Sequence, residues 1–190
     1  MGKLVFLVGI PYAGKTTLGK RVAELMHNLP FYDIDDMAQA KLSEVLLSKA
    51  MNPLERMRYL EGAQLSAFFE FININGPAIV ATAAEIALVP ECVEIMKNTG
   101  HIILLKRDID IILSELRNSD YTGPVLKEVD TGTIWDIREK TALAYADELP
   151  RYEAVADLTL DNNGSEHDGV VLLRTHIETI IKGEPPCAVC

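Results

Sequence analysis

The sequence predicts an α/β fold, a parallel sheet with helices on both faces. Apolar strand-like runs alternate with helical patterns along the chain, as is typical of such a sheet. A glycine-rich turn joins the first of these runs to the first helical pattern. The chain has 190 residues, 48% hydrophobic and 24% charged, which fits one globular domain with a full core. We expect a single domain over residues 1–182 and a loosely held tail at 183–190.

The glycine-rich turn, residues 9–16, reads G-x-x-x-x-G-K-T. Residues 4–8 before it form an unbroken apolar run, typical of a strand that is buried on both faces. Residues 17–26 after it have helical spacing. Strand, glycine loop and helix in this order are the context in which the motif marks a phosphate-binding loop. We therefore expect a three-layer P-loop NTPase fold, with five parallel strands flanked by helices and a lid.

The chemistry of this loop follows from its residue types. Gly9 and Gly14 let the backbone turn so that N–H groups point at phosphate oxygens, and the helix that follows presents its positive end to the same anion. Lys15 should reach the β- and γ-phosphates of ATP, and the Thr16 hydroxyl should ligate Mg²⁺. The residues expected to hold the nucleotide at the loop are Gly9, Tyr12, Ala13, Gly14, Lys15, Thr16 and Thr17.

A second short strand, within residues 29–36, ends in carboxylates, and sites in open α/β sheets form at the carboxyl ends of strands. Asp33 and Asp35 alternate with Ile34, so on an extended backbone both would point the same way. That arrangement suits one carboxylate on the Mg²⁺ shell and one on the hydroxyl of a substrate. Asp36 would fall on the other side and start the next helix. The alternative is an acidic turn that only contacts solvent.

Two helices should follow. The first covers about residues 37–50, and Asn52, with a proline next and Glu55 placed for a capping box, predicts the start of the second. Arg58 and Glu61 are three apart on this second helix, so they can pair on one face. Either they form an ordinary surface ion pair, or the glutamate orients the arginine over a ligand cleft. The sequence does not choose between these readings.

Residues 77–85 predict a third buried strand that ends in small side chains. Ala83 and Ala84 at its carboxyl end would allow a ligand to approach closely. Glu85 differs from them because it places an ionisable group where a pocket is expected. The later elements are a helix at 90–98 that ends at Gly100, a strand at 101–105, a helix at 108–117, a polar lid at 118–132, a helix at 133–154, a strand at 156–160 and a last helix that opens at 165–168 with a capping pattern.

Composition limits the classes of partner. The formal net charge of −10 argues against nucleic acid or an anionic membrane as the main partner. No segment approaches the roughly 20 apolar residues of a membrane span, and the N-terminus lacks the shape of a signal peptide. Cys92, Cys187 and Cys190 do not form a disulfide framework, so we expect a cytoplasmic protein. The four histidines show no metal-ligand spacing.

These motifs resemble the shikimate kinase family, small P-loop kinases that phosphorylate the 3-hydroxyl of shikimate with MgATP. The resemblance covers about residues 3–181. It implies that Asp33 lies on the Mg²⁺ side and that Asp35 binds and orients the acceptor hydroxyl. The family's Phe-Arg-x-x-Glu stands here as residues 57–61, where Arg58 would contact the substrate carboxylate. The loop after the last strand, which contains Asn162, would border the adenine, with Arg117 on its other side.

Three departures from the family pattern concern the acceptor side. The family's Gly-Gly-Gly loop stands here as residues 83–85, and the lid motif Arg-Pro-Leu-Leu stands as residues 123–126, without the arginine. The family's Arg-x-Pro-Leu-Tyr stands as residues 148–152, so that Glu148 replaces the arginine and Arg151 follows three residues later. The residues that could replace the lid arginine are Arg117, Lys127 and Arg151.

The expected function is transfer of the γ-phosphate of ATP to a hydroxyl of a small molecule, with Lys15 and Asp35 as catalytic residues and no membrane or nucleic-acid partner. One alternative is a different acceptor, which could bear an amine because Glu85 and Glu148 would repel a carboxylate. Others are a nucleoside monophosphate kinase and a nucleotide-binding regulatory protein. We expect a monomer, with a dimer as the alternative. The residues expected at the acceptor are Asp35, Arg58, Ala83, Ala84, Glu85 and Arg151, and those at the metal are Thr16 and Asp33.

Overall fold

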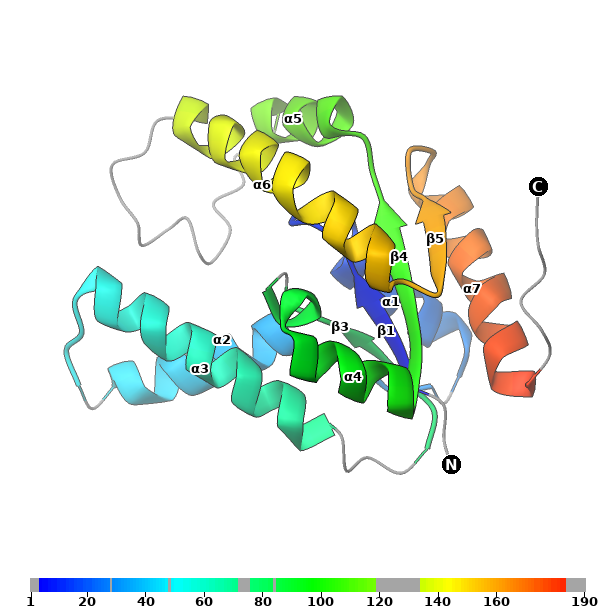
Figure 1. Ribbon diagram of the computed structural model, residues 1–190, viewed down its shortest axis with the longest axis horizontal. Coiled ribbons are helices and arrows are strands. Elements are labelled where there is room, and N and C mark those ends of the chain that lie inside the picture. The colour runs from blue at the N-terminus through cyan, green and yellow to red at the C-terminus, as the bar shows by residue number, and fades with distance from the viewer. Residues whose placement is uncertain are drawn as a thin grey trace.

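The computed structural model describes residues 4–27, 29–47, 49–71, 76–83, 85–118 and 134–183 (Figure 1). Apolar runs form the strands and amphipathic segments form the helices, as the sequence pattern predicts. In chain order the elements are β1 (Leu4–Val8), α1 (Lys15–Leu25), β2 (Phe31–Asp33), α2 (Ile34–Leu46), α3 (Pro53–Phe71), β3 (Ala78–Ala81), the 3₁₀-helix η1 (Glu85–Leu88), α4 (Pro90–Thr99), β4 (Gly100–Lys106), α5 (Ile109–Asn118), α6 (Ile134–Val155), β5 (Leu158–Asp161) and α7 (Glu166–Lys182).

The strands form one parallel sheet in the order β2-β3-β1-β4-β5. The first strand of the chain lies at its centre, where Leu4 is opposite Ala78 on one side and Gly100 on the other. All residues of β1 are buried, because helices cover both faces of the sheet. The predicted five-stranded parallel sheet is therefore confirmed.

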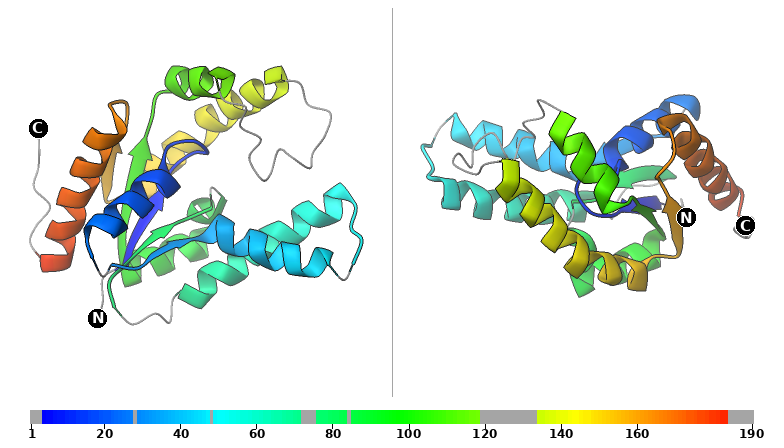
Figure 2. Two further views of the ribbon diagram at one scale, coloured as in Figure 1. Left: turned by 180° about the vertical axis from the view of Figure 1, so that it is seen from behind. Right: turned by 90° about the horizontal axis from the view of Figure 1, so that it is seen from above.

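The helices are arranged in layers around this sheet. Helices α1 and α7 pack together on one face, and α4 and α6 cover the other (Figures 1 and 2). Helices α2 and α3 pack against each other and project beyond the β2 side of the sheet (Figure 1). The loop after β1 and the start of α2 after β2 both lie at the carboxyl ends of parallel strands, where α/β folds place their ligand sites.

Helix α2 begins at Ile34, earlier than the expected start near residue 37. The reason is a cap: the side chain of Asp33 accepts hydrogen bonds from the backbone N–H groups of Asp35 and Asp36, which would otherwise lack partners. Asp35 therefore lies in the first turn of a helix. The expectation that it alternates with Asp33 along an extended strand is wrong.

The predicted capping boxes are confirmed at both later helices. Asn52 accepts a hydrogen bond from the backbone N–H of Glu55, whose carboxylate accepts one in return, each at 3.0 Å. Ser165 and Asp168 make the same reciprocal pair at the start of α7. Of the predicted lid, at 118–132, the structure describes only Asn118, which is the last residue of α5. Of the predicted tail, at 183–190, it describes only Gly183, which caps α7. The rest of both segments lies outside the described residues.

Candidate active site

The loop between β1 and α1 carries the strongest backbone constraints in the site. Gly9 and Gly14 have φ angles of 141° and 94°, which favour glycine. A Cβ on Gly9 would also lie 2.7 Å from the carbonyl oxygen of Leu105. Tyr12 has a positive φ of 67° although it is not a glycine, and no signal in the sequence predicts this. These backbone constraints hold the loop in one shape, in which successive N–H groups are expected to point at a phosphate.

Lys15 is folded back over this loop. Its ammonium group donates hydrogen bonds to the carbonyl oxygens of Gly9, at 2.7 Å, and Ile10, at 3.1 Å. Burial lowers the pKa of Lys15, and the negative charges of Asp35, Asp33 and Glu148 act in the opposite direction. The buried ammonium of Lys15, held by the loop carbonyls, therefore lies at the centre of the phosphate loop.

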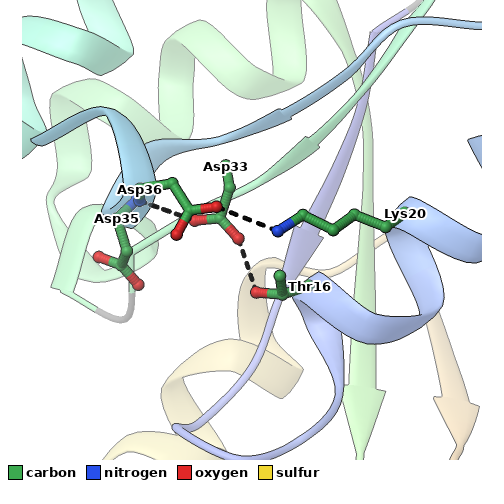
Figure 3. A network of polar contacts seen from close by, with 5 residues as sticks. All are labelled: Thr16, Lys20, Asp33, Asp35 and Asp36. Carbon is green, nitrogen blue, oxygen red and sulfur yellow. Dashed lines mark hydrogen bonds and ion pairs between the residues drawn. The ribbon is translucent and has the colours of Figure 1, made fainter. Parts of the chain in front are cut away.

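Thr16 and Asp33 join the phosphate loop to the start of α2. The Thr16 hydroxyl donates a hydrogen bond to one oxygen of the Asp33 carboxylate at 2.6 Å, and the other oxygen caps α2 (Figure 3). Asp33 is buried, and Thr16 is partly buried in the first turn of α1. These two residues, expected together at a metal, are brought into direct contact.

The side chains of Asp35 and Asp36 have different partners from that of Asp33. Asp36 turns toward Lys20 and forms an exposed ion pair with it at 3.1 Å (Figure 3). Asp35 accepts a hydrogen bond from the side-chain amide of Gln64, on α3, at 2.8 Å. The sequence analysis misses Gln64, because no motif marks a residue that reaches Asp35 only through the packing of α3 against α2.

The ionisation of Asp35 is perturbed. Part of its side chain is open to solvent, yet protein atoms crowd the carboxylate, and this partial burial raises its pKa above the ordinary value. The charge of Lys15 and the hydrogen bond from Gln64 act in the opposite direction. The solvent-exposed part weakens all of these effects by screening.

Glu148 and Tyr152 bring a further acidic group to this region from α6. The Tyr152 hydroxyl, which is fully buried, donates a hydrogen bond to the Glu148 carboxylate at 3.0 Å. The negative charge of Glu148 acts on Lys15 in the same direction as those of Asp35 and Asp33, and opposes the lowering of its pKa by burial.

Two arginines expected at the acceptor are exposed and line two different hollows. Arg151 is exposed and pairs with Asp147 at 3.6 Å, and it lines a hollow of about 640 Å³ between α4 and α6. Arg58 is exposed on α3, where it lines a hollow of about 300 Å³ with Lys41. Within the described part of the chain, Arg58 and Glu61 form no ion pair with each other.

The remaining expected residues are distributed as follows. Ala13 and Asn162 are buried in contact with each other, Thr17 is exposed in the first turn of α1, and Ala83 is buried just after β3. Ala84 and the side chains of Glu85 and Arg117 fall outside the described residues.

The described residues contain no group of three or more histidine, cysteine, aspartate or glutamate side chains placed to hold a metal ion. Nor do they include a helix with the length and apolar character needed to cross a membrane.

Comparison with known proteins identifies the family. The family model for shikimate kinase matches residues 11–182. The chain belongs to the shikimate kinase family. It is accordingly an ATP-dependent phosphotransferase that acts on a hydroxyl of a small molecule. A curated shikimate kinase from Dictyoglomus turgidum is 24% identical over 165 residues, which cover 86% of this chain and 90% of the relative.

Solved structures agree on the fold. A crystal structure of shikimate kinase from Bacteroides thetaiotaomicron matches with a TM-score of 0.71 at 20% identity, over 93% of this chain and 98% of that one. Shikimate kinase from Acinetobacter baumannii in complex with shikimate matches with a TM-score of 0.72 at 20% identity, over 96% and 94%. The P-loop kinase fold predicted from the sequence is thus confirmed.

Proposed function

We propose that the chain transfers the γ-phosphate of ATP to a hydroxyl of shikimate or of a closely similar hydroxylated ring carboxylic acid. The observation that carries this proposal is the 2.6 Å hydrogen bond from Thr16 to Asp33, because it joins the phosphate loop to the start of α2, where Asp35 offers a carboxylate to a hydroxyl. The family match supports a hydroxyl acceptor. The A. baumannii relative, described in complex with shikimate, supports the acceptor class.

The nucleotide half of the proposal rests on the loop. The N–H groups that follow Gly9 and Gly14 hold the β- and γ-phosphates, and Lys15 moves its ammonium from the loop carbonyls to the phosphate oxygens. Arg117 and the loop that contains Asn162 border the adenine. Because phosphoryl transfer asks little covalent chemistry of the protein, the main contributions are position and charge.

The residues around Thr16 fit Mg²⁺. Mg²⁺ binds oxygen ligands, and in kinases it usually takes one or two protein groups, substrate phosphates and waters. Thr16 and Asp33 offer a hydroxyl and a carboxylate oxygen 2.6 Å apart, directly beside the phosphate loop. Thr16 would ligate the ion, and Asp33 would act directly or through water. When bound, Mg²⁺ neutralises charge that develops on the phosphates.

Asp35 accepts a hydrogen bond from the acceptor hydroxyl and orients its oxygen toward the γ-phosphorus. It can take the proton as the new O–P bond forms. Gln64 holds one oxygen of this carboxylate at 2.8 Å, which leaves the other for the acceptor.

For the acceptor carboxylate, Arg58 is our first candidate, because it lines a hollow on α3 and forms no ion pair among the described residues, whereas Lys41 beside it is paired with Glu70. Arg151 is the second candidate, and it would have to leave Asp147 to take part. Ala83, Ala84 and Glu85 would line the end of the acceptor site next to β3.

The test is ADP release in a coupled assay with MgATP and shikimate, run beside amino alcohols, sugars and nucleoside monophosphates. We expect shikimate-dependent ADP release that is lost in Lys15→Ala and in Asp35→Asn. Gln39→Ala, a neutral change on the same helix as Asp35, is the control and should retain activity.

Two results would contradict the proposal. Turnover of an amino alcohol without turnover of shikimate would assign the acceptor site to a cationic substrate, which the negative charge of Glu148 would attract. Binding of ATP without turnover of any acceptor would instead indicate a regulatory protein.

We also propose a monomer in the cytoplasm. Size-exclusion chromatography with light scattering measures the mass directly, and a mass of twice 21.0 kDa would show a dimer instead.

A further inference from the structure

Asn162 links the loop after β5 to the phosphate loop. Its side-chain amide donates a hydrogen bond to the carbonyl oxygen of Ala13 at 2.9 Å, across 149 positions of sequence. Its own backbone N–H donates to the carbonyl oxygen of Lys106 at 2.7 Å, which fixes the residue to the end of β4. Only 6% of Asn162 is exposed. An amide this buried and anchored at both ends has a defined position.

Two glycines make room for this amide. A Cβ on Gly14 would lie 2.8 Å from the Asn162 side-chain nitrogen, and a Cβ on Gly169 would lie 2.6 Å from its side-chain oxygen. Gly169 is in the first turns of α7, where glycine costs helix stability and no positive φ requires it. The close approach of Asn162, together with the Leu18 side chain 3.1 Å from such a Cβ, explains the glycine.

We propose that Asn162 is a positioning residue for ATP, which keeps the phosphate loop in its ligand-binding shape. This inference rests on the proposed binding of ATP and names a role that is separate from contact with adenine. A trans peptide directs its C=O and N–H groups in opposite directions. By holding the Ala13 carbonyl, Asn162 fixes the Gly14 N–H on the opposite side of that peptide, and this N–H belongs to the set that should bind phosphate.

The position of Gly14 makes this restraint useful. With its φ of 94°, Gly14 has no Cβ to restrict rotation of the preceding peptide, so the glycine that permits the turn does not by itself fix it. The amide of Asn162 supplies the missing restraint from a different part of the chain. Loss of the amide should therefore reduce the affinity for phosphate groups and leave the acceptor site unchanged.

The experiment measures binding of inorganic tripolyphosphate with Mg²⁺ and of the ATP analogue adenylyl imidodiphosphate, by calorimetry, to the full chain. For Asn162→Ala we expect both dissociation constants to rise by about fivefold, the scale of one lost hydrogen bond. Asn163→Ala is the matched control: Asn163 lies next in the same loop and bonds to Asp108 and Asp161, without touching the phosphate loop. For this control we expect no change in the dissociation constant for tripolyphosphate, which has no adenine for the loop to contact.

A second pair of variants tests whether the effect on binding acts through the Asn162 amide. Gly169→Ala would normally stabilise a helix, but its methyl group would meet the Asn162 amide, so we expect it to weaken tripolyphosphate binding as Asn162→Ala does. In the Asn162→Ala background, the same Gly169→Ala change should have no further effect on binding. Melting temperatures measured for all variants separate loss of binding from loss of fold.

Three outcomes would overturn the inference. If Asn162→Ala weakens the ATP analogue but not tripolyphosphate, Asn162 acts on the adenine. If Asn162→Ala and Asn163→Ala weaken binding equally, the effect belongs to the loop as a whole. If Gly169→Ala weakens binding equally in both backgrounds, its effect on binding does not act through the Asn162 amide. The binding experiments contain no acceptor, so none of these results depends on which acceptor the chain phosphorylates. If the wild-type chain binds neither tripolyphosphate nor the ATP analogue, the proposed ATP site itself is refuted.

Discussion

Replacement of Asp33 separates its structural contribution from its expected contribution at the metal. In Asp33→Ala, α2 loses an N-cap that accepts from two N–H groups, which costs about 1 kcal/mol. The charge-assisted hydrogen bond from Thr16, at 2.6 Å, adds about 1.5 kcal/mol. Since 1 kcal/mol shifts the melting temperature of a domain this long by roughly 2–4 °C, we expect a fall of about 5–10 °C.

Asp33→Asn should behave differently because the asparagine side chain keeps an oxygen for the cap and an NH₂ group that can donate to the Thr16 hydroxyl. We expect its melting temperature to stay within about 2 °C of the wild type. The negative charge is lost, however, so the Mg²⁺ concentration for half-maximal activity should rise by about tenfold or more.

The assay is thermal unfolding by circular dichroism, with a Mg²⁺ titration of ADP release at saturating ATP. Asp36→Asn is the control: it lies in the same acidic group, but it has only an exposed ion pair with Lys20, so neither measurement should change appreciably. If Asp33→Asn unfolds as early as Asp33→Ala and its Mg²⁺ dependence stays at the wild-type value, the two contributions are not separable and the reasoning is wrong.

Other predictions follow from single contacts. Asp35 must be ionised to accept a proton, so kcat/KM should fall as the pH drops through its raised pKa. Gln64→Ala removes a hydrogen bond that lowers this pKa, so the acid limb of the pH profile should move to higher pH. In Gln39→Ala the acid limb should stay in place. A limb that moves to lower pH would contradict this reasoning. Gly100→Ala places a Cβ 2.1 Å from a carbonyl oxygen of β1 and should lower the free energy of unfolding in urea by about 1–3 kcal/mol or more. An unchanged unfolding midpoint would show that β1 and β4 can move apart to accommodate the methyl group. Ser165→Ala removes the cap of α7 and should cost about 1 kcal/mol with an unchanged m-value, and a loss below a few tenths would mean that Asp168 caps the helix alone.

The nucleotide half of the site could be predicted from the sequence because its causes are local. Residues 9–16 specify their own turn through two glycines, and the apolar run before them specifies a buried strand. The capping boxes at Asn52 and Ser165 are also local, since each depends on a spacing of three residues. Such features are specified within a few residues.

The rest depends on how distant elements pack. Asp35 was expected on an extended backbone, but Asp33 caps the helix and turns Asp35 away, since a short carboxylate can satisfy N–H groups two and three residues later. Gln64 reaches Asp35 only because α3 packs on α2. The effect of the Glu148 charge on Lys15 likewise depends on how α6 packs against the sheet. No pattern within one segment contains these contacts.

The central place of β1 has a consequence for synthesis of the chain. Among the described strands, β1 pairs with β3 and β4, both of which follow it by about 70 residues or more, so these pairings wait until residue 78 has been made. Until then five consecutive apolar residues, Leu4–Val8, have no strand beside them. Parallel pairing over such separations is slow and leaves apolar surface exposed to aggregation. Newly made chains should therefore depend on chaperones until β3 has emerged.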